Sequence, residues 1–286
     1  MRDRRIVIRF LLCLCAALAA CEKHSAQSST SKRPVRAAVI GGMTSTCLWQ
    51  EVSARFEIAT GTKVILAITG ERETCAEAFR KGGVDILTMH SGDISTNLVA
   101  DGYGTNMRPW TRNDLVIVGP KSDPAGVRGM KDGAAALAKI AANQSPFLDF
   151  QGIGSREMAH NLWKAAGIPN PQGDWMLKDE SHDKWSSLKF AQERGAYVIT
   201  GRIPVRTGKL PAEGMEILVE GDPAMRRPFI VMEANPRRFP DANSAGAAAL
   251  AEFLLSTEIQ SFLREFGAKD YGGVPLFHPV ESGAAQ

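Results

Sequence analysis

The 286-residue chain contains 44% hydrophobic and 23% charged residues, the balance of an ordinary soluble globular protein. This length suffices for one large domain or for two lobes that each bury a core. The formal net charge of +3 comes from the first 20 residues, where four arginines stand against one aspartate, and the remaining chain is neutral. A neutral body without a basic stripe argues against a nucleic-acid-binding protein.

Residues 1–20 have the pattern of an export signal. Their arginines precede an apolar stretch, residues 10–20, that is too short to span a bilayer comfortably. The stretch ends in Leu18-Ala19-Ala20-Cys21, which resembles the bacterial lipoprotein processing box. This resemblance implies that Cys21 becomes the lipidated first residue of the mature chain; a plain secretory signal or a short anchor is the alternative. We therefore expect a lipoprotein anchored in the cell envelope, facing the periplasm.

Residues 21–34 are polar and serine-rich, which predicts a flexible linker, and the pattern then changes. Apolar runs alternate with segments of helical period, which predicts parallel-rich sheets flanked by helices. The predicted strands are residues 35–40, 63–68, 84–89, 115–118, 196–200, 217–220 and 229–233. The predicted helices are residues 48–59, 74–81, 137–143, 155–166, 186–194, 244–255 and 258–266.

These elements outnumber those of one open sheet of this kind, which favours an α/β fold of two lobes with a cleft between them. We assign residues 35–115 and 228–286 to lobe I and residues 116–227 to lobe II. The crossing segments near residues 113–120 and 217–229 are the expected hinge.

Glycines and small hydroxyl residues follow the first predicted strand, in the run Gly41-Gly42-Met43-Thr44-Ser45-Thr46. A strand that ends in such residues and then opens a helix presents backbone N–H groups that lack helical partners, at the positive end of the helix dipole. The hydroxyls of Thr44, Ser45 and Thr46 are further donors. The simpler interpretation is that Ser45 or Thr46 only caps the helix.

Two other places in the chain fit the same anion site. Thr69 and Gly70 follow the second predicted strand, and a neighbouring strand would end at the same edge of the sheet. In lobe II, Ser155 and Arg156 open a helix, and an arginine offers a charged fork suited to oxyanions. Arg156 could instead be a solvated arginine or an ion-pair partner of Asp149. His90 and Arg202 are weaker candidates, for which packing and surface roles are more natural.

Cys47 and Cys75 are the cysteines that remain after the signal and Cys21. Each begins a predicted helix just after one of the first two strands. A Cys47–Cys75 disulfide beside the cleft and two buried free thiols are both open. Without a C-x-x-C pair or a Cys/His cluster, no metal site is expected.

Several longer motifs resemble one known family. The longest is the block of residues 85–130, which contains Gly102-Tyr103-Gly104 and the run from Asn113 to Pro120. Shorter matching pieces are the run 43–46, Arg108-Pro109 and residues 123–126, 162–168, 195–197 and 219–222. The chain resembles the extracellular tungstate-binding proteins of ABC importers over about the whole body, from Val35 to Val280.

The resemblance implies a periplasmic-binding-protein-like fold of type II and capture of a small tetrahedral oxyanion, tungstate or molybdate. It also implies an ABC permease and ATPase as partners, with the anion as ligand and no cofactor. We expect a monomer that binds no nucleic acid. The family's SRGDDSGT-like stretch, whose Arg, Ser and Thr lie at the bound oxyanion, is absent here. Residues 147–156 replace it, so we expect a rebuilt half-site in lobe II.

Two other functions remain open on the sequence. The same fold could capture an organic carboxylate, phosphate or sulfate, or serve a sensor, because a fold hosts many functions. An enzyme is disfavoured, because the chain has no G-x-S-x-G elbow, no H-E-x-x-H motif and no G-x-x-x-x-G-K-[ST] loop.

Overall fold

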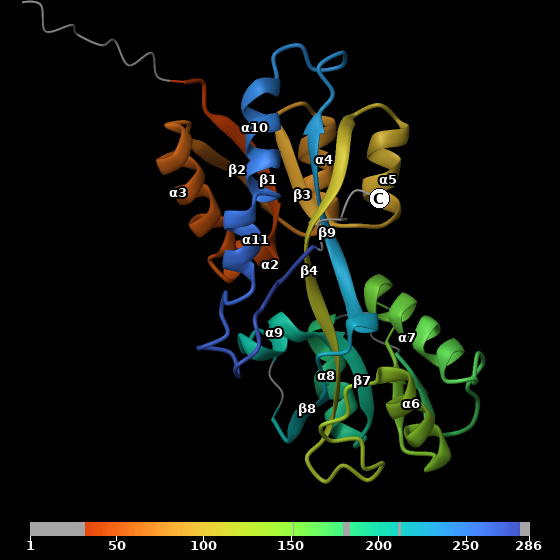
Figure 1. Cartoon of the computed structure of the whole chain (residues 1–286). Coiled ribbons are helices and arrows are strands. Elements are labelled where there is room, and N and C mark those ends of the chain that lie inside the picture. The colour runs from red at the N-terminus through yellow and green to blue at the C-terminus, as the bar shows by residue number, and fades with distance from the viewer. Residues whose placement is uncertain (1–31, 151, 180–183, 211–212, 281–286) are drawn as a thin grey trace, which may run out of the picture. The chain divides into compact units, whose positions relative to one another are not determined.

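The computed structural model describes residues 32–150, 152–179, 184–210 and 213–280 (Figure 1). From Arg33 to Gln286 the chain forms one compact unit. The predicted signal, Cys21 and nearly all of the predicted linker lie outside the described residues.

Ten strands and ten α-helices are found in the described part of this unit. The strands are β1 (Val35–Ile40), β2 (Val64–Gly70), β3 (Ile86–His90), β4 (Gly104–Pro120), β5 (Phe147–Asp149), β6 (Met176–Lys178), β7 (Tyr197–Gly201), β8 (Met215–Val219), β9 (Arg226–Ala234) and β10 (His278–Pro279). The helices are α2 (Gly41–Ser45), α3 (Leu48–Thr60), α4 (Arg72–Arg80), α5 (Asp93–Ala100), α6 (Gly133–Ala142), α7 (Ile153–Ala165), α8 (Lys184–Glu193), α9 (Arg202–Arg206), α10 (Ser244–Leu254) and α11 (Thr257–Leu263), and the 3₁₀-helix η1 is Pro223–Met225.

The strands follow the order β2-β1-β3-β9-β4-β7-β5-β6, and β8 and β10 also pair with β4. Strands β1, β2 and β3 are parallel, as are β5, β6 and β7. All pairs that involve β4 or β9 are antiparallel. The prediction of parallel strands therefore holds within each group, and the groups are joined by antiparallel strands.

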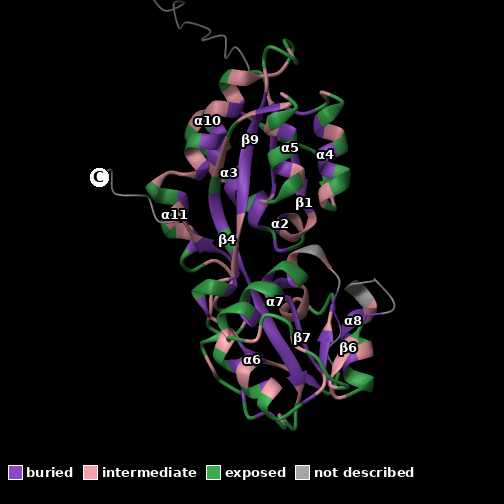
Figure 2. Cartoon of the chain, turned by 90° about the vertical axis from the view of Figure 1, so that its right-hand side faces the viewer, coloured by how far each residue is buried: buried purple, intermediate pink, exposed green. Residues whose placement is uncertain are grey.

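Strand β4 is 17 residues long and belongs to both groups. Its first part pairs with β9 from Gly104 to Asp114, and its last part pairs with β7 and β8 from Leu115 to Pro120. Figure 1 shows β4 and β9 running between the two groups, and Figure 2 shows that both are buried over most of their length. The predicted strand 115–118 covers only the end of β4.

The buried apolar side chains form three clusters. The first packs around Trp49, Phe56 and Phe79 and takes its members from residues 35–110 and 229–277, with the addition of Ile203. The second and third contain residues between 115 and 225. We keep lobe I and lobe II as names for the elements around the first cluster and around the other two. The residue boundaries assigned from the sequence stay a prediction.

The first predicted helix is confirmed as α3, but a short helix that was not predicted, α2, precedes it. Cys47 has a φ of 63°, a left-handed conformation that is costly for a residue other than glycine, and it separates the short α2 from α3. Helix α3 then ends where the sequence predicts, because Gly61 adopts the left-handed conformation and its N–H donates to the Glu57 carbonyl at 2.8 Å. Residues Gly41–Ser45 are thus themselves helical and are not the loop before a helix.

Candidate functional site

A cavity of about 540 Å³ is lined by residues of both lobes. Lobe I contributes the ends of β1, β2 and β3 and the starts of α2 and α4. Lobe II contributes Phe150, Gly152, Gly154 and Ser155 around the start of α7, and residues around α9. The crossing strands β4 and β9 form a further wall. This cavity is the candidate site, and the residues predicted from the sequence are placed relative to it below.

Helix α2 directs its start at the cavity. Strand β1 ends at Ile40 and α2 begins at once with Gly41, and no side chain caps this helix start. Gly41, Gly42, Thr44 and Ser45 line the cavity. The first N–H groups of an α-helix lack intrahelical partners, so this end of α2 offers donors to an anion.

The predicted hydroxyl groups divide into two sets. The Thr44 and Thr69 hydroxyls lie 2.9 Å apart, and both residues line the cavity with Ser45 and Gly70. All three hydroxyls of the run 44–46 donate to carbonyls of α2: Thr44 to Gly41 at 3.1 Å, Ser45 to Gly42 at 3.4 Å, and Thr46 to Gly42 at 2.9 Å and Met43 at 3.2 Å. Thr46 is 8% exposed and does not line the cavity. The structure therefore brings Thr44, Ser45 and Thr69 together and leaves Thr46 out.

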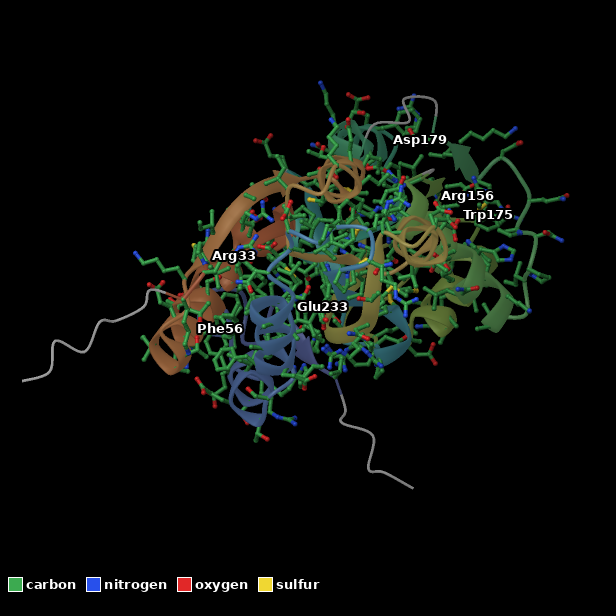
Figure 3. All side chains as sticks on the ribbon, turned by 90° about the horizontal axis from the view of Figure 1, so that it is seen from above. Arg33, Phe56, Arg156, Trp175, Asp179 and Glu233 are labelled. Atoms are coloured by element: carbon green, nitrogen blue, oxygen red, sulfur yellow. The ribbon has the colours of Figure 1, made fainter. Side chains whose placement is uncertain are left out.

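Ser155 and Arg156 also separate. Ser155, near the start of α7, is nearly buried and lines the 540 Å³ cavity. Arg156 lines a different cavity of about 870 Å³, together with Asp149, Glu157 and His160. Seen from above, Arg156 and Trp175 lie toward the same side (Figure 3). Successive residues of a helix point about 100° apart, and here this rotation places Ser155 on one cavity and Arg156 on the other.

Arg227 is the cavity residue that the sequence analysis missed. It stands near the start of β9, inside the predicted hinge segment, and lines the cavity. Its Nη2 lies 3.2 Å from Nε2 of His90, and its Nε is shielded from solvent without a hydrogen-bond partner among the described residues. Burial, helped by the positive charge of Arg72, lowers the pKa of Arg227 to about 10; Glu157 opposes this shift. The charge of a residue in a hinge segment is the signal that could have identified it.

The contact with Arg227 determines the tautomer of His90. An arginine has only donors, so the Nε2 atom of His90 must accept, which assigns the ring proton to Nδ1 and makes the ring neutral. The imidazole also packs against Phe229, with ring centroids 4.1 Å apart. His90 therefore orients Arg227 from the end of β3, and it lines the cavity itself.

Asn113 is another polar residue of the wall. It lies on β4 and is 4% exposed, and its amide oxygen has no hydrogen-bond partner within the described ranges. Asn113 and Arg227 thus both leave a polar atom unsatisfied beside the cavity. Buried polar atoms are normally paired, so such atoms mark a place where a ligand or water completes the bonding.

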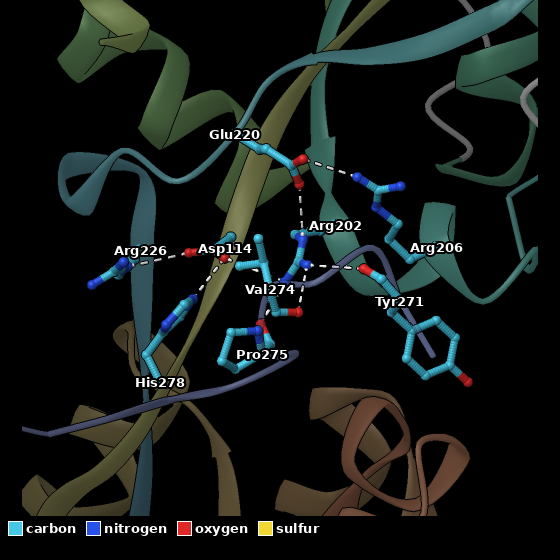
Figure 4. Close-up of polar contacts among 9 residues, drawn as sticks. All are labelled: Asp114, Arg202, Arg206, Glu220, Arg226, Tyr271, Val274, Pro275 and His278. Atoms are coloured by element: carbon cyan, nitrogen blue, oxygen red, sulfur yellow. Dashed lines mark hydrogen bonds and ion pairs between the residues drawn. The ribbon is translucent and has the colours of Figure 1, made fainter. Parts of the chain in front are cut away.

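Arg202 lies neither on the surface nor on the cavity wall. It is 1% exposed at the start of α9, and it donates to Oε2 of Glu220 and to the carbonyls of Tyr271, Val274 and Pro275 (Figure 4). Asp114, on β4, lies 3.7 Å from it. The expectation of a surface role for Arg202 is wrong, because a buried guanidinium needs many acceptors and finds them here.

The Cys47–Cys75 disulfide is absent from the structure. Both cysteines are free thiols; Cys75 is buried in α4 and Cys47 is exposed. Burial raises the pKa of Cys75 to about 11. The alternative of two buried thiols is therefore correct for Cys75 and wrong for Cys47, which the left-handed turn between α2 and α3 leaves on the surface.

Neither a metal-ligand cluster nor a membrane-spanning helix is found among the described residues. No three histidine, cysteine, aspartate or glutamate side chains are grouped so that they could hold a metal ion in this part of the chain. None of the helices that the structure describes combines the length and the apolar character required to cross a bilayer.

Comparison with known proteins identifies the family. Residues 37–269 match the model of the bacterial extracellular solute-binding proteins. The chain belongs to this family. As in other members, a mixed α/β fold of two lobes with flanking helices surrounds the site.

Among the sequence relatives of this solute-binding protein, two have similar identities. A putative ABC transporter anion-binding protein of Haloferax volcanii is 32% identical over 211 residues, which are 71% of this chain and 59% of that protein. The chain therefore spans less than two thirds of that relative. The tungstate-binding protein TupA of Peptoclostridium acidaminophilum is 30% identical over 285 residues, and the match covers 96% of each chain.

Solved structures of two tungstate-binding transport proteins are also similar to this chain. The tungstate-binding protein TupA of Desulfovibrio alaskensis superposes with a TM-score of 0.71 at 28% identity, covering 86% of this chain and 99% of that one. The tungstate ABC transporter protein of Geobacter sulfurreducens superposes with a TM-score of 0.66 at 26% identity, covering 82% and 99%.

Proposed function

We propose that this solute-binding protein captures a tetrahedral oxyanion, tungstate or molybdate, for an ABC importer. The observation that carries the proposal is the convergence of donors from both lobes on one cavity. Thr44, Ser45 and Thr69 meet the start of α2 on the side of lobe I, and Ser155 lies at the start of α7 on the side of lobe II. The names of the relatives and of the solved structures support this choice of ligand.

The physical requirement is that a dianion taken out of water receives hydrogen bonds on its oxygens, since its desolvation is otherwise not offset. Hydroxyl groups and helix N–H groups meet this requirement without a proton transfer. A ligand held from both lobes favours the closed arrangement through its additional contacts there, and the closed form is the one that a transporter would recognise.

The partners are an ABC permease and an ATPase, in line with the relative named for ABC transport of anions. We further propose that the mature protein is a monomer tethered to the membrane by lipid at Cys21, on the periplasmic side of the cell envelope. Mass spectrometry of the protein extracted from membranes would check the anchor, and an unmodified Cys21 would contradict it.

An organic anion is the second candidate ligand. Apolar side chains, among them Phe150, Leu210 and Phe229, share the cavity wall with the polar groups. Its volume lies in the range of small-molecule sites and exceeds what a single tetrahedral anion fills. An anion with an apolar body would contact the apolar side chains as well as the polar groups of the cavity.

Calorimetry and thermal unfolding of residues 22–286, which contain the whole compact unit, test the function. Tungstate, molybdate, sulfate, phosphate and small carboxylates are the ligands to compare. A ligand at 1,000 times its Kd stabilises the protein by about 4 kcal/mol, so the cognate anion raises the unfolding temperature by several degrees. If no oxyanion changes the unfolding temperature, the oxyanion proposal is wrong, and a response to carboxylates alone supports the second candidate.

A further inference from the structure

We propose that Arg227 is the cation that contacts the captured oxyanion, and that Gly154 is the residue that makes room for it. This inference rests on the proposed function, but it is tested separately below. It assigns to a crossing strand the charge that the resemblance places in a loop of lobe II, and it assigns no ligand contact to Arg156.

Glu157 is a carboxylate close enough for its charge to act on Arg227. Among the residues that the structure describes, no carboxylate forms an ion pair with this arginine, and the group within hydrogen-bond reach is the neutral imidazole of His90. Arg72, another cavity residue, is close enough for its charge to act on Arg227. The cationic side chains of Arg72, Lys209 and Arg227 line this cavity with one carboxylate, that of Glu71. With the Nε of Arg227 unpaired among the described residues, this net positive wall is a place that an anion stabilises.

Gly154 explains how Arg227 reaches this place. A Cβ added at Gly154 would lie 2.8 Å from Cζ of Arg227 and would overlap its Nη1. The backbone of Gly154 does not require glycine, because its φ is not positive and the residue lies within α7. A side chain at this position in the first turn of α7 would displace the guanidinium, so the close approach of Arg227 is a physical reason for glycine here.

Arg156 provides the contrast within the same helix. It lines the 870 Å³ cavity, where Asp149 and Glu157 are also found. The two arginines therefore face different cavities, one rich in carboxylates and one rich in donors. Arg227, unlike Arg156, lines the 540 Å³ cavity that Thr44, Thr69 and Ser155 also line.

The charge of the ligand follows from the same geometry. Attraction to a net positive cavity wall grows with each negative charge of the ligand, so tungstate is favoured over a monoanion of the same shape. Perrhenate is that monoanion: it is tetrahedral, close to tungstate in size, and carries one negative charge. The ratio of the two affinities therefore reports the cationic environment and not the size of the cavity.

Calorimetric titration of residues 22–286 with tungstate and perrhenate tests the inference. We expect Arg227→Gln to weaken tungstate binding at least 100-fold and to reduce the preference over perrhenate at least tenfold. Arg156→Gln, the matched control in α7, leaves both affinities within twofold. Gly154→Ala alone weakens tungstate binding at least tenfold. In the double variant with Arg227→Gln, the same change weakens tungstate binding by less than a further twofold.

Urea denaturation of each ligand-free variant separates binding from folding. We expect Gly154→Ala to keep the wild-type unfolding midpoint or to raise it, since alanine favours the helix. Tungstate binding by Arg227→Gln at wild-type affinity would overturn the inference and leave the proposed function intact. An independent loss from Gly154→Ala in the Arg227→Gln background would overturn the role of Gly154. Wild-type protein that binds no oxyanion would overturn the proposed function and this inference together.

Discussion

At the scale of single residues, the direction of a side chain separates binding groups from structural ones. Thr44 and Thr46 have the same chemistry two positions apart, and both hydroxyls donate to carbonyls of their own helix, yet Thr44 also lines the cavity beside Thr69 and Thr46 does not. A sequence motif specifies which groups are present, but the helical geometry of Gly41–Ser45 decides which of them a ligand meets.

Thr44→Val and Thr46→Val make this difference measurable, since valine keeps the shape of threonine and removes the hydroxyl. We expect Thr44→Val to weaken oxyanion binding by about 2 kcal/mol, the contribution of a hydrogen bond to a charged group. Thr46→Val leaves the affinity nearly unchanged and affects the free energy of unfolding instead. Titration calorimetry and urea denaturation check the pair, and equal losses of affinity would contradict the arrangement.

The thiols of Cys47 and Cys75 differ in their exposure to solvent. Cys47 is exposed, whereas burial raises the pKa of Cys75 to about 11 and removes it from solvent. At pH 8 Cys75 is almost entirely protonated, and thiolates are the reactive form. We expect iodoacetamide to modify one thiol in native residues 22–286 and both after unfolding, counted by mass spectrometry. Rapid modification of both native thiols would show that α4 does not protect Cys75.

At the scale of elements, the periodicity of the sequence predicts most helices and the parallel strands, since these depend on local pattern and burial. It misses the length of β4, because Pro109 and the polar residues around it interrupt the apolar run while β9 still pairs with them. It misses β5, β6 and β10, which are only two or three residues long. The anion corner at Thr44 and Thr69 is predicted from strand ends, whereas Arg227 depends on how β9 crosses.

Helix α9 is held to the C-terminal segment through Arg202, and this contact is expected to be worth much more than a surface ion pair. Arg202 and Asp114 are each 1% exposed, and removing one partner of a buried ion pair costs about 3 to 5 kcal/mol. We expect Arg202→Met to lower the free energy of unfolding by about that amount, measured in urea.

Arg206→Met is the control for this change, because Arg206 contacts the same Glu220 from a side chain that is 30% exposed. An ion pair of this exposure contributes less than about 1 kcal/mol. If the two variants are equally stable, the buried network around Asp114 does not hold α9 as described.

At the scale of the whole folded unit, the cavity is shared by residues from distant parts of the chain. Thr44 and Ser155 belong to different lobes, and Arg227 lies on a strand that joins them. A ligand that contacts all three therefore favours one relative placement of the lobes over others. This is why the sequence could predict the lobe I corner as a local motif but could not predict the complete site.

The position of β9 between β3 and β4 has a kinetic consequence. In lobe I, β9 lies between β3 and β4, so the sheet is incomplete until residues 226–234 are available, about 140 positions after β3. The elements around the second and third clusters lie in one stretch between residues 115 and 225. Contacts that are close in sequence form sooner, since less loop entropy is lost. We expect pulsed hydrogen exchange during refolding to show protection of the β7 amides before the β3 amides. A chain that starts unfolded would therefore complete its binding site last.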